Sequence, residues 1–271
     1  MMTNHPPKLS ARSMGLINWI GLKTLVQKEM ERFFNVYMQT IIAPIVTLLL
    51  FFTVFSIALG GGAEGREILG VPYMHFLAPG LLMMTMAQNA FANSSSSLII
   101  AKVQGTIVDV LMPPLSSLEI LIGLMIGATV RGMMIGVIGA LILALFVHVP
   151  VSNIGLIILY AVLGNMMMGA LGILGGLWAE KFDHLAAISN FVITPMTFLA
   201  GTFYALTALP VAWQGIALLN PFFYMIDGFR AGFIGVAEAS IGFGLMLMLG
   251  FTILLIIAAY TLLKTGYKIK S

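Results

Sequence analysis

The chain has 271 residues, of which 60% are hydrophobic and only 8% charged, and its formal net charge is +3. A soluble domain carries about 25% charged residues because it must wet its whole surface, so this composition excludes a soluble protein. The basic balance is typical of lysines and arginines that collect on the cytoplasmic side of a membrane, and we expect no nucleic-acid partner.

The N-terminal part predicts a cytosolic tail followed by a helix that lies on the membrane surface. The tail spans 1–17, and its residues 1–13 are polar and lack the apolar core of a cleavable signal peptide. Over 18–37, apolar side chains recur at three- and four-residue steps while charged side chains fall on other faces, which predicts an interfacial connecting helix. The apolar positions are Trp19, Leu22, Val26, Met30, Phe33 and Tyr37.

Long runs with few or no charges follow, and each reaches the roughly 20 residues needed to cross a bilayer. We predict an all-α integral membrane protein with six transmembrane helices, within 40–60, 71–101, 120–147, 154–179, 185–206 and 241–263. These helices form a single transmembrane domain over 38–263, and residues 264–271 form a second cytosolic tail. Every Asp and Glu is expected in a loop or at a span end, including Asp109, Glu119, Asp227 and Glu238.

The stretch 207–226 is apolar enough to be a seventh span, but Pro210 and Asn220-Pro221 interrupt any continuous helix. A seventh span would also export the three C-terminal lysines. Six spans keep both termini cytoplasmic and leave only Arg66 and Arg230 outside, as the distribution of basic residues requires. We therefore predict that 207–230 forms short re-entrant helices in the outer leaflet between spans 5 and 6, buried against protein.

The side chains that could act in catalysis or bind a metal argue against an enzyme and against a metal site. The chain has no cysteine, and its four histidines lie at span ends or outside spans, never paired at metal-ligand spacing. Carriers driven by ion gradients usually bury a carboxylate within a span, and none is expected here. The sequence also lacks the GxxxxGK[ST] phosphate loop. Uphill transport by this chain would therefore need a separate ATPase.

A few polar side chains inside the predicted spans are candidates for a pathway or gate. Arg131 is the one charge in the middle of a span, and its insertion costs about 3 kcal/mol unless it finds partners. It is either a pathway residue or a structural arginine bonded to carbonyls. The polar stretch of the second span is open to the same two interpretations. The candidate pathway or gate residues are Gln88, Asn89, Asn93, Arg131, Phe198 and Phe203.

Three segments resemble the permeases of the bacterial ABC-2 type transporter family, in its YadH-like branch. The segment 102–117, with Gly105-Thr106, Asp109 and Pro113-Pro114, is similar to that family's coupling segment, although Lys102-Val103-Gln104 carries less charge than usual. The stretch 209–230 is similar to the outer re-entrant motif. The run Lys28-Glu29-Met30-Glu31-Arg32-Phe33 completes the resemblance.

The resemblance implies a half-transporter in the inner membrane. Two copies would pair as a homodimer in contact with membrane lipid and with two ABC ATPase subunits, which would carry the ATP and Mg. This chain itself would hold no cofactor. The residues implied in ATPase coupling are Lys28, Glu29, Arg32, Gly105, Thr106, Asp109, Leu111, Pro113 and Pro114. Those implied in the outer motif are Asn220, Pro221, Asp227 and Arg230.

The expected function is the outward movement of an amphipathic or hydrophobic substrate of drug, lipid or glycolipid type, by alternating access. Three alternatives stay open: a passive channel or facilitator, an exporter of polysaccharides or glycan precursors, and an assembly factor without a path of its own. The scarcity of charge in the spans favours apolar or lipid-like cargo.

Overall fold

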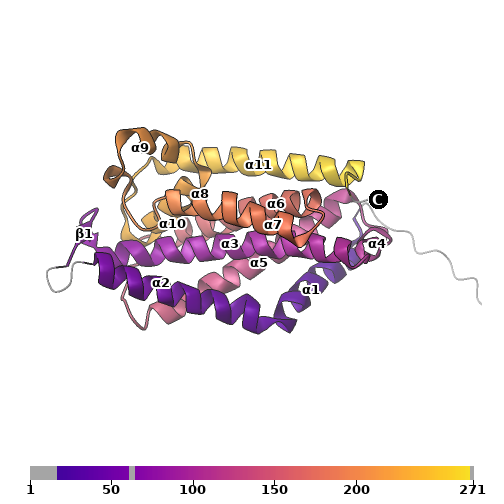
Figure 1. Ribbon diagram of the computed structural model, residues 1–271, viewed down its shortest axis with the longest axis horizontal. Helices are drawn as coiled ribbons and strands as arrows, with labels where there is room; N and C mark the ends of the chain where they lie inside the picture. Colours follow the sequence, from indigo (N-terminus) through magenta and orange to yellow (C-terminus); the bar gives the residue numbers. More distant parts are fainter. Residues whose placement is uncertain (1–16, 61–64, 269–271) are drawn as a thin grey trace, which may run out of the picture.

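The computed structural model describes residues 17–60 and 65–268, most of which form helices, and most of the longer helices run along the long axis of the molecule (Figure 1). The predicted tail over 1–17 lies almost wholly outside the described residues, as do 269–271 of the C-terminal tail. The longer helices are α1 (Trp19–Asn35), α2 (Ala43–Leu59), α3 (Tyr73–Val103), α5 (Ser117–Leu143), α6 (Ile154–Trp178), α10 (Pro221–Ile234) and α11 (Ile241–Thr265). The shorter ones are α4 (Ile107–Leu111), α7 (Phe182–Ile188), α8 (Thr194–Leu199), the 3₁₀ turn η4 (Leu206–Ala208) and α9 (Val211–Leu218).

Four described helical segments are long and apolar enough to cross a membrane: Met38–Leu59, Ser117–Leu143, Ile154–Trp178 and Ile241–Thr265. They correspond to four of the six predicted spans. The predicted second span is α3, whose 31 residues suffice in length but include a run of amides and serines that lowers its hydropathy. The predicted fifth span is a continuous helical run in which α7, a π-helical turn and α8 follow one another directly. The all-helical membrane class is confirmed, and the count of six stays a prediction.

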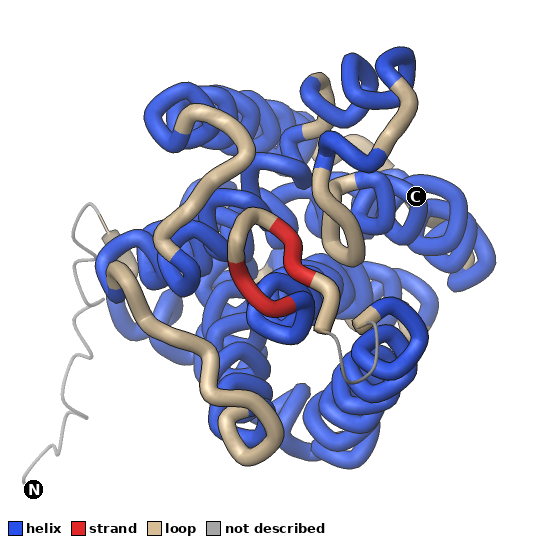
Figure 2. The backbone as a smooth tube through the Cα atoms, turned by 90° about the vertical axis from the view of Figure 1, so that its left-hand side faces the viewer, coloured by secondary structure: helices blue, strands red, loops and turns tan. Residues whose placement is uncertain are grey.

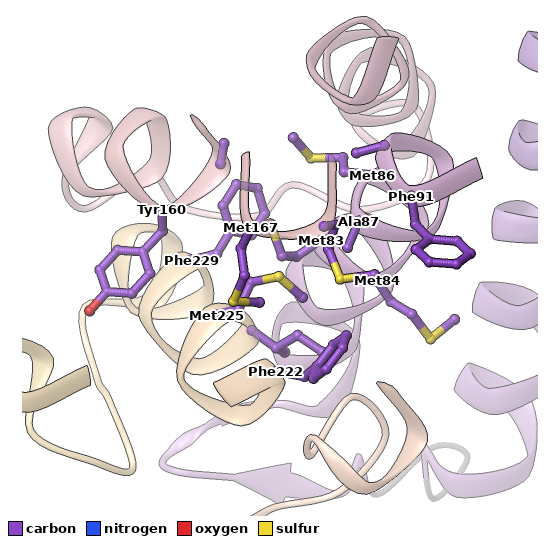
Figure 3. Close-up of a cluster of buried hydrophobic side chains, with 14 of the residues drawn as sticks. Met83, Met84, Met86, Ala87, Phe91, Tyr160, Met167, Phe222, Met225 and Phe229 are labelled. Atoms are coloured by element: carbon purple, nitrogen blue, oxygen red, sulfur yellow. The ribbon is translucent and has the colours of Figure 1, made fainter. Parts of the chain in front are cut away.

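Helix α3 is the centre of the bundle and is buried along most of its length, mainly against α5 and α6. Glycines on α6 allow the close approach, since a Cβ at Gly176 would lie 2.9 Å from the carbonyl oxygen of Ser95. Flexible methionines fill the irregular space between α3, α6 and α10 (Figure 3). Those labelled there are Met83, Met167 and Met225. The glycines of α6 thus form a packing face toward α3.

Helix α1 confirms a helix within the predicted 18–37, and the side that it buries in the protein shares Leu22 and Phe33 with the predicted apolar stripe. The buried residues are Leu22, Leu25, Glu29 and Phe33, whereas Trp19 is 69% exposed and Tyr37 is also exposed. The cause is packing against α5. A Cβ at Gly123 would lie 2.6 Å from Leu25 Cδ2, and one at Gly127 would lie 2.8 Å from Glu29 Cβ. Two glycines on α5 thus form the surface that selects the buried face of α1.

Two π-helical turns with the same hydrogen bond precede α2 and α8. In η1 (Met38–Ile42) the amide of Ala43 donates to the carbonyl of Met38, and in η3 (Ser189–Ile193) the amide of Thr194 donates to that of Ser189. Each turn is followed by a proline, Pro44 or Pro195, at the second position of the next helix. A proline interrupts the regular helical hydrogen bonds, and a π-turn absorbs the interruption without ending the helix.

The ends of the bundle differ, and we name them the α4 end and the α9 end. The α4 end holds α4 and the end of α11, and the α9 end holds α9 and a short hairpin (Figure 1). The hairpin pairs β1 (Glu67–Ile68) with β2 (Val71–Pro72), a small departure from the all-α prediction. Figure 2 shows it lying over the helix ends. Within 207–230 the predicted short helices are present, but α10 continues to Ile234 and is buried, and re-entry into a membrane stays a prediction.

The glycine surface under α1 leads to the first prediction. We expect Gly127→Val to destabilise the protein by about 1–3 kcal/mol, the usual cost of overpacking, because the new side chain would overlap Glu29. Thermal unfolding in detergent measures this effect. Gly250→Val on α11 is the matched control, since its Cβ would meet no atom within 4 Å. Equal melting temperatures for the two variants would contradict the packing of α1 on α5.

Candidate functional site

At the α4 end, one carboxylate joins the start of α1 to the loop between α4 and α5. Glu119 accepts hydrogen bonds from the Ser116 amide (2.6 Å) and hydroxyl (2.8 Å), which closes the capping box of α5. Its other oxygen accepts from the amide of Asn18 (2.5 Å). Asn18 also donates to the carbonyl of Pro114 (3.3 Å). Sequence analysis missed this role of Glu119, although the Ser-x-x-Glu spacing before an apolar run is the signal of a capping box.

The segment between α3 and α5 projects from this end and is largely exposed. Gly105 has φ +73, a left-handed conformation that only glycine adopts without strain, and it separates α3 from α4. Thr106, Asp109, Pro113 and Pro114 are all exposed. The side chain of Leu111, which ends α4, lies outside the described part. The predicted coupling residues of this segment therefore lie together on one projection.

The predicted coupling residues of α1 are not equally exposed. Lys28 faces outward, whereas Glu29 is only 2% exposed and forms a 3.0 Å ion pair with Arg32. Arg32 also donates to the Asn93 carbonyl and side-chain oxygens, at 2.8 and 3.0 Å, and to Ser96 at 3.0 Å. Ser97 donates to Glu29 at 2.6 Å. Glu29 and Arg32 thus hold α1 to α3.

Arg131 is buried at the centre of the bundle, one turn along α5 from Gly127. Its Nη2 donates to the side-chain oxygen of Asn89 (2.9 Å), while its Nε has no partner among the described residues. Asn89 in turn donates to the carbonyl of Thr85 (2.9 Å). Arg131 therefore fixes the orientation of an amide that lines the groove described next, which links the structural and the pathway interpretations of this arginine.

A groove of about 220 Å³ lies between α2 and α3, and polar side chains line much of it. Its lining residues are Gln39, Ala43, Pro44, Thr47, Phe51, Met84, Thr85, Gln88 and Asn89. Along α3, Gln88, Ala92 and Ser96 recur at four-residue steps and are partly exposed, and we call this stripe the polar face. Gln88 donates to the hydroxyl of Thr197 on α8 (3.3 Å). The two proline-linked π-turns therefore precede the two helices that contact the polar face.

Toward the α9 end, aromatic rings from α2 and the α8 region gather. The centroid of Phe203 lies 4.3 Å from that of Phe55, 5.0 Å from that of Phe198 and 6.3 Å from that of Phe51. Of the two predicted gate residues, Phe203 is buried and Phe198 is 36% exposed. The structure thus brings both into one aromatic cluster on the same side of α3 as α2.

The α9 end also contains a buried charged cluster, although Arg230 and Glu238 are predicted to lie in an outer loop. Arg230 is fully buried, lies 3.6 Å above the ring of Phe76, donates to the Gly201 carbonyl (2.5 Å) and pairs with Glu238 (3.5 Å). Asp227 accepts from the backbone amides of Glu238 and Ala239 at 3.0–3.1 Å. These charges can be buried because Arg230, Asp227, Glu238 and backbone amides satisfy one another.

Two further residues of the predicted outer motif position α10. The side chain of Asn220 accepts from the Phe222 amide (3.0 Å) and caps the helix, and Pro221 occupies its first position. The Asn220 amide also donates to the carbonyl of Met196 on α8 (2.8 Å). Asn220 therefore joins α10 to α8, as Arg230 joins it to the chain after α8.

Comparison with known proteins places this geometry in a family. The family model described as "ABC-2 type transporter" matches residues 21–234. The chain is 34% identical to the inner membrane transport permease YadH of Escherichia coli (strain K12), over 93% of this chain and 98% of that protein. It is also 29% identical to nodulation protein J of Rhizobium leguminosarum bv. viciae, over 69% of this chain and 73% of that protein.

The buried cluster leads to the second prediction. We expect Arg230→Met to destabilise the protein by about 3–5 kcal/mol, because Asp227 and Glu238 would remain buried without their counter-charge. Thermal unfolding in detergent measures the loss. Arg66→Met removes an exposed arginine at the same end and should leave the melting temperature unchanged. An Arg230→Met protein as stable as the Arg66→Met control would refute the role of the ion pair.

Proposed function

The chain belongs to the ABC-2 type transporter family, and we propose that it is the membrane-spanning half of an exporter whose power comes from a separate ATPase. Two copies form the path and each rests on one ATPase subunit, which carries the ATP and Mg. The observation that carries this proposal is the joint at Glu119. Through it, one push on the exposed α4 projection is transmitted both to α5 and to α1.

The distribution of basic residues supports an orientation in the inner membrane in which the α4 end faces the cytosol. Lys102 donates to the carbonyls of Leu177 and Ala179 at the end of α6, and Lys268 pairs with Glu180 (2.7 Å). The hydrogen bond from Lys268 also lowers the pKa of the Glu180 carboxyl. Arg66 lies at the opposite end. Basic residues collect on the cytoplasmic side, so both termini are cytoplasmic, with α3 and α7–α8 crossing as the two further spans.

The polar face supports a path between two copies. In a bilayer, partly exposed amides and hydroxyls on a central helix require a polar partner or water, not lipid. A second copy placed against α2, α3 and α8 would enclose this face. The two π-turns would then let α2 and α8 bend as the path opens to alternate sides, and the Phe198–Phe203 cluster would close it at the α9 end.

The lining of the groove also favours a class of cargo. Its polar side chains are amides and hydroxyls, its other residues are apolar, and no charged side chain is among them. Such a surface matches an uncharged amphiphile whose head group forms hydrogen bonds. Arg131 acts on the groove only through Asn89. The proposed cargo is therefore an amphipathic molecule of lipid, glycolipid or drug type.

The coupling role leads to the third prediction. We expect Asp109→Lys to weaken the binding of the partner ATPase about tenfold, which corresponds to roughly 1.4 kcal/mol of binding free energy, so that less ATPase co-purifies with the chain. Thermal stability should not change, because Asp109 is exposed. The stimulation of ATP turnover in the reconstituted complex should fall in parallel.

Asp183→Lys is the matched control for this experiment, because Asp183 is an exposed aspartate in the first turn of α7 at the same end. It should leave ATPase recovery and turnover unchanged. Flux through liposomes that contain the chain without any ATPase would instead support a passive channel, and the proposal would fail.

The path leads to the fourth prediction, for which the chain offers a natural cysteine-free background. Single cysteines at Gln88 and Ser96 should react with a water-soluble thiol reagent and form disulfides between two copies in membranes, because both positions are partly exposed on the polar face. A cysteine at Ala90, which is fully buried on another side of α3, is the control and should do neither. Equal behaviour of all three positions would exclude a path between copies along α3.

A further inference from the structure

A second and larger cavity, of about 400 Å³, lies between α3, α5, α6 and α10, and it shares no lining residue with the groove along α2. Every residue that lines it is apolar. The walls formed by α5, its C-cap and α6 include Gly136, Ala140, Leu141, Ala144, Ile154 and Ala161. The remaining walls include Ala78, Pro79, Leu82 and Met86 of α3, and Phe229 and Phe233 of α10.

The cavity exists because α5 and α6 separate toward the α9 end. Nearer the α4 end they touch, since a Cβ at Gly169 would lie 2.9 Å from Ala128. Further along, Gly136, Ala140 and Ala144 recur at four-residue steps on α5, a spacing that ordinarily brings a second helix close. Here they line the cavity instead. Met86 of α3 packs against Gly136, but Ala140 and Ala144 face the open cavity instead of a closely packed α6.

The exposure of the lining shows where the cavity opens. Leu82, Ala161 and Phe229 form its floor and are 2–3% exposed, whereas Leu141 and Ile154 are 67% and 61% exposed at its rim. Both α5 and α6 are among the helices long and apolar enough to span a membrane, so the exposed rim faces the bilayer. The buried Val147 of the α5–α6 loop lines the side toward the α9 end.

We propose that this cavity binds one acyl chain of a bilayer phospholipid as a structural lipid. Water is excluded, because an apolar cavity of even about 150 Å³ stays dry and instead accepts an apolar ligand such as benzene. An empty cavity would also deprive its lining of dispersion contacts. A site that opens sideways into the hydrocarbon of the bilayer receives the chains that surround it, and a phospholipid tail has the linear shape that enters between two helices.

The bound chain supports the seat of α10. Phe229 and Phe233 lie on α10, the helix that also carries Asp227 and Arg230 of the buried charged cluster. An acyl chain packed against the two rings would therefore help to hold α10 in place. The lipid site is independent of the proposed transport path and of any ATPase. Measurements of lipid binding to the purified chain therefore test the lipid site separately from the proposed function.

Photolabelling tests the site directly. The chain is reconstituted in vesicles of phosphatidylcholine that carries a diazirine in the middle of one acyl chain, irradiated, and mapped by peptide mass spectrometry. We expect adducts concentrated in 136–144 and 157–161, and their loss in Ala140→Phe, whose ring fills the cavity. Ala58→Phe is the control, because Ala58 is exposed on α2 near the same end and does not line the cavity.

A second measurement keeps the test independent of the folding of one variant. Adding phosphatidylcholine to the detergent-purified protein should raise its melting temperature by about 2–4 °C, and Ala140→Phe and Ala144→Leu should abolish this rise. Adducts in 136–144 that persist in both variants, or an unchanged lipid-dependent rise in both, would overturn the proposal. Adducts spread evenly over all lipid-facing helices of the wild-type protein would overturn it equally.

Discussion

A bundle in lipid must satisfy each buried polar group from within the protein, because hydrocarbon offers no hydrogen bonds. This constraint sets the positions of the helices here. Glu29 holds α1 against α3, Glu119 holds the start of α1 against the loop before α5, and Arg230 with Asp227 and Glu238 holds α10 against the chain that follows α8. The apolar core, rich in methionine, fills space without dictating one arrangement. The polar joints supply the specificity that such a core lacks.

The same constraint explains how much the sequence could predict. Composition and uncharged runs predict the membrane class and four of the helices, because insertion depends on local hydropathy. Gly105 and the prolines at 113–114 predict an exposed turn around α4, since their backbone preferences are local. Asn220-Pro221 likewise predicts a helix start. The resemblance to the ABC-2 family, carried by short motifs, is confirmed over residues 21–234.

What the sequence could not predict depends on partners distant in the chain. The buried face of α1 is chosen by glycines about 100 residues away on α5, which no periodicity within α1 reveals. Glu238 lies in a loop, as predicted, but the sequence does not show that it is buried there beside Arg230 and the Leu206 amide. The helical run from α7 to α8 contains Pro195, and the local sequence does not show that the chain accommodates this proline with a π-turn instead of ending the helix. The role of Arg131 likewise depends on its hydrogen bond to Asn89 of α3, which the sequence does not show.

The small size of the α4 projection has a consequence for how such chains diversify. Gly105 separates it from α3 on one side, and Pro113-Pro114 separate it from α5 on the other, so its exposed side chains take no part in the core. Substitutions there are free of the packing penalties that restrain the rest of the bundle. Its exposed positions can therefore change in sequence without disturbing the packing of the bundle.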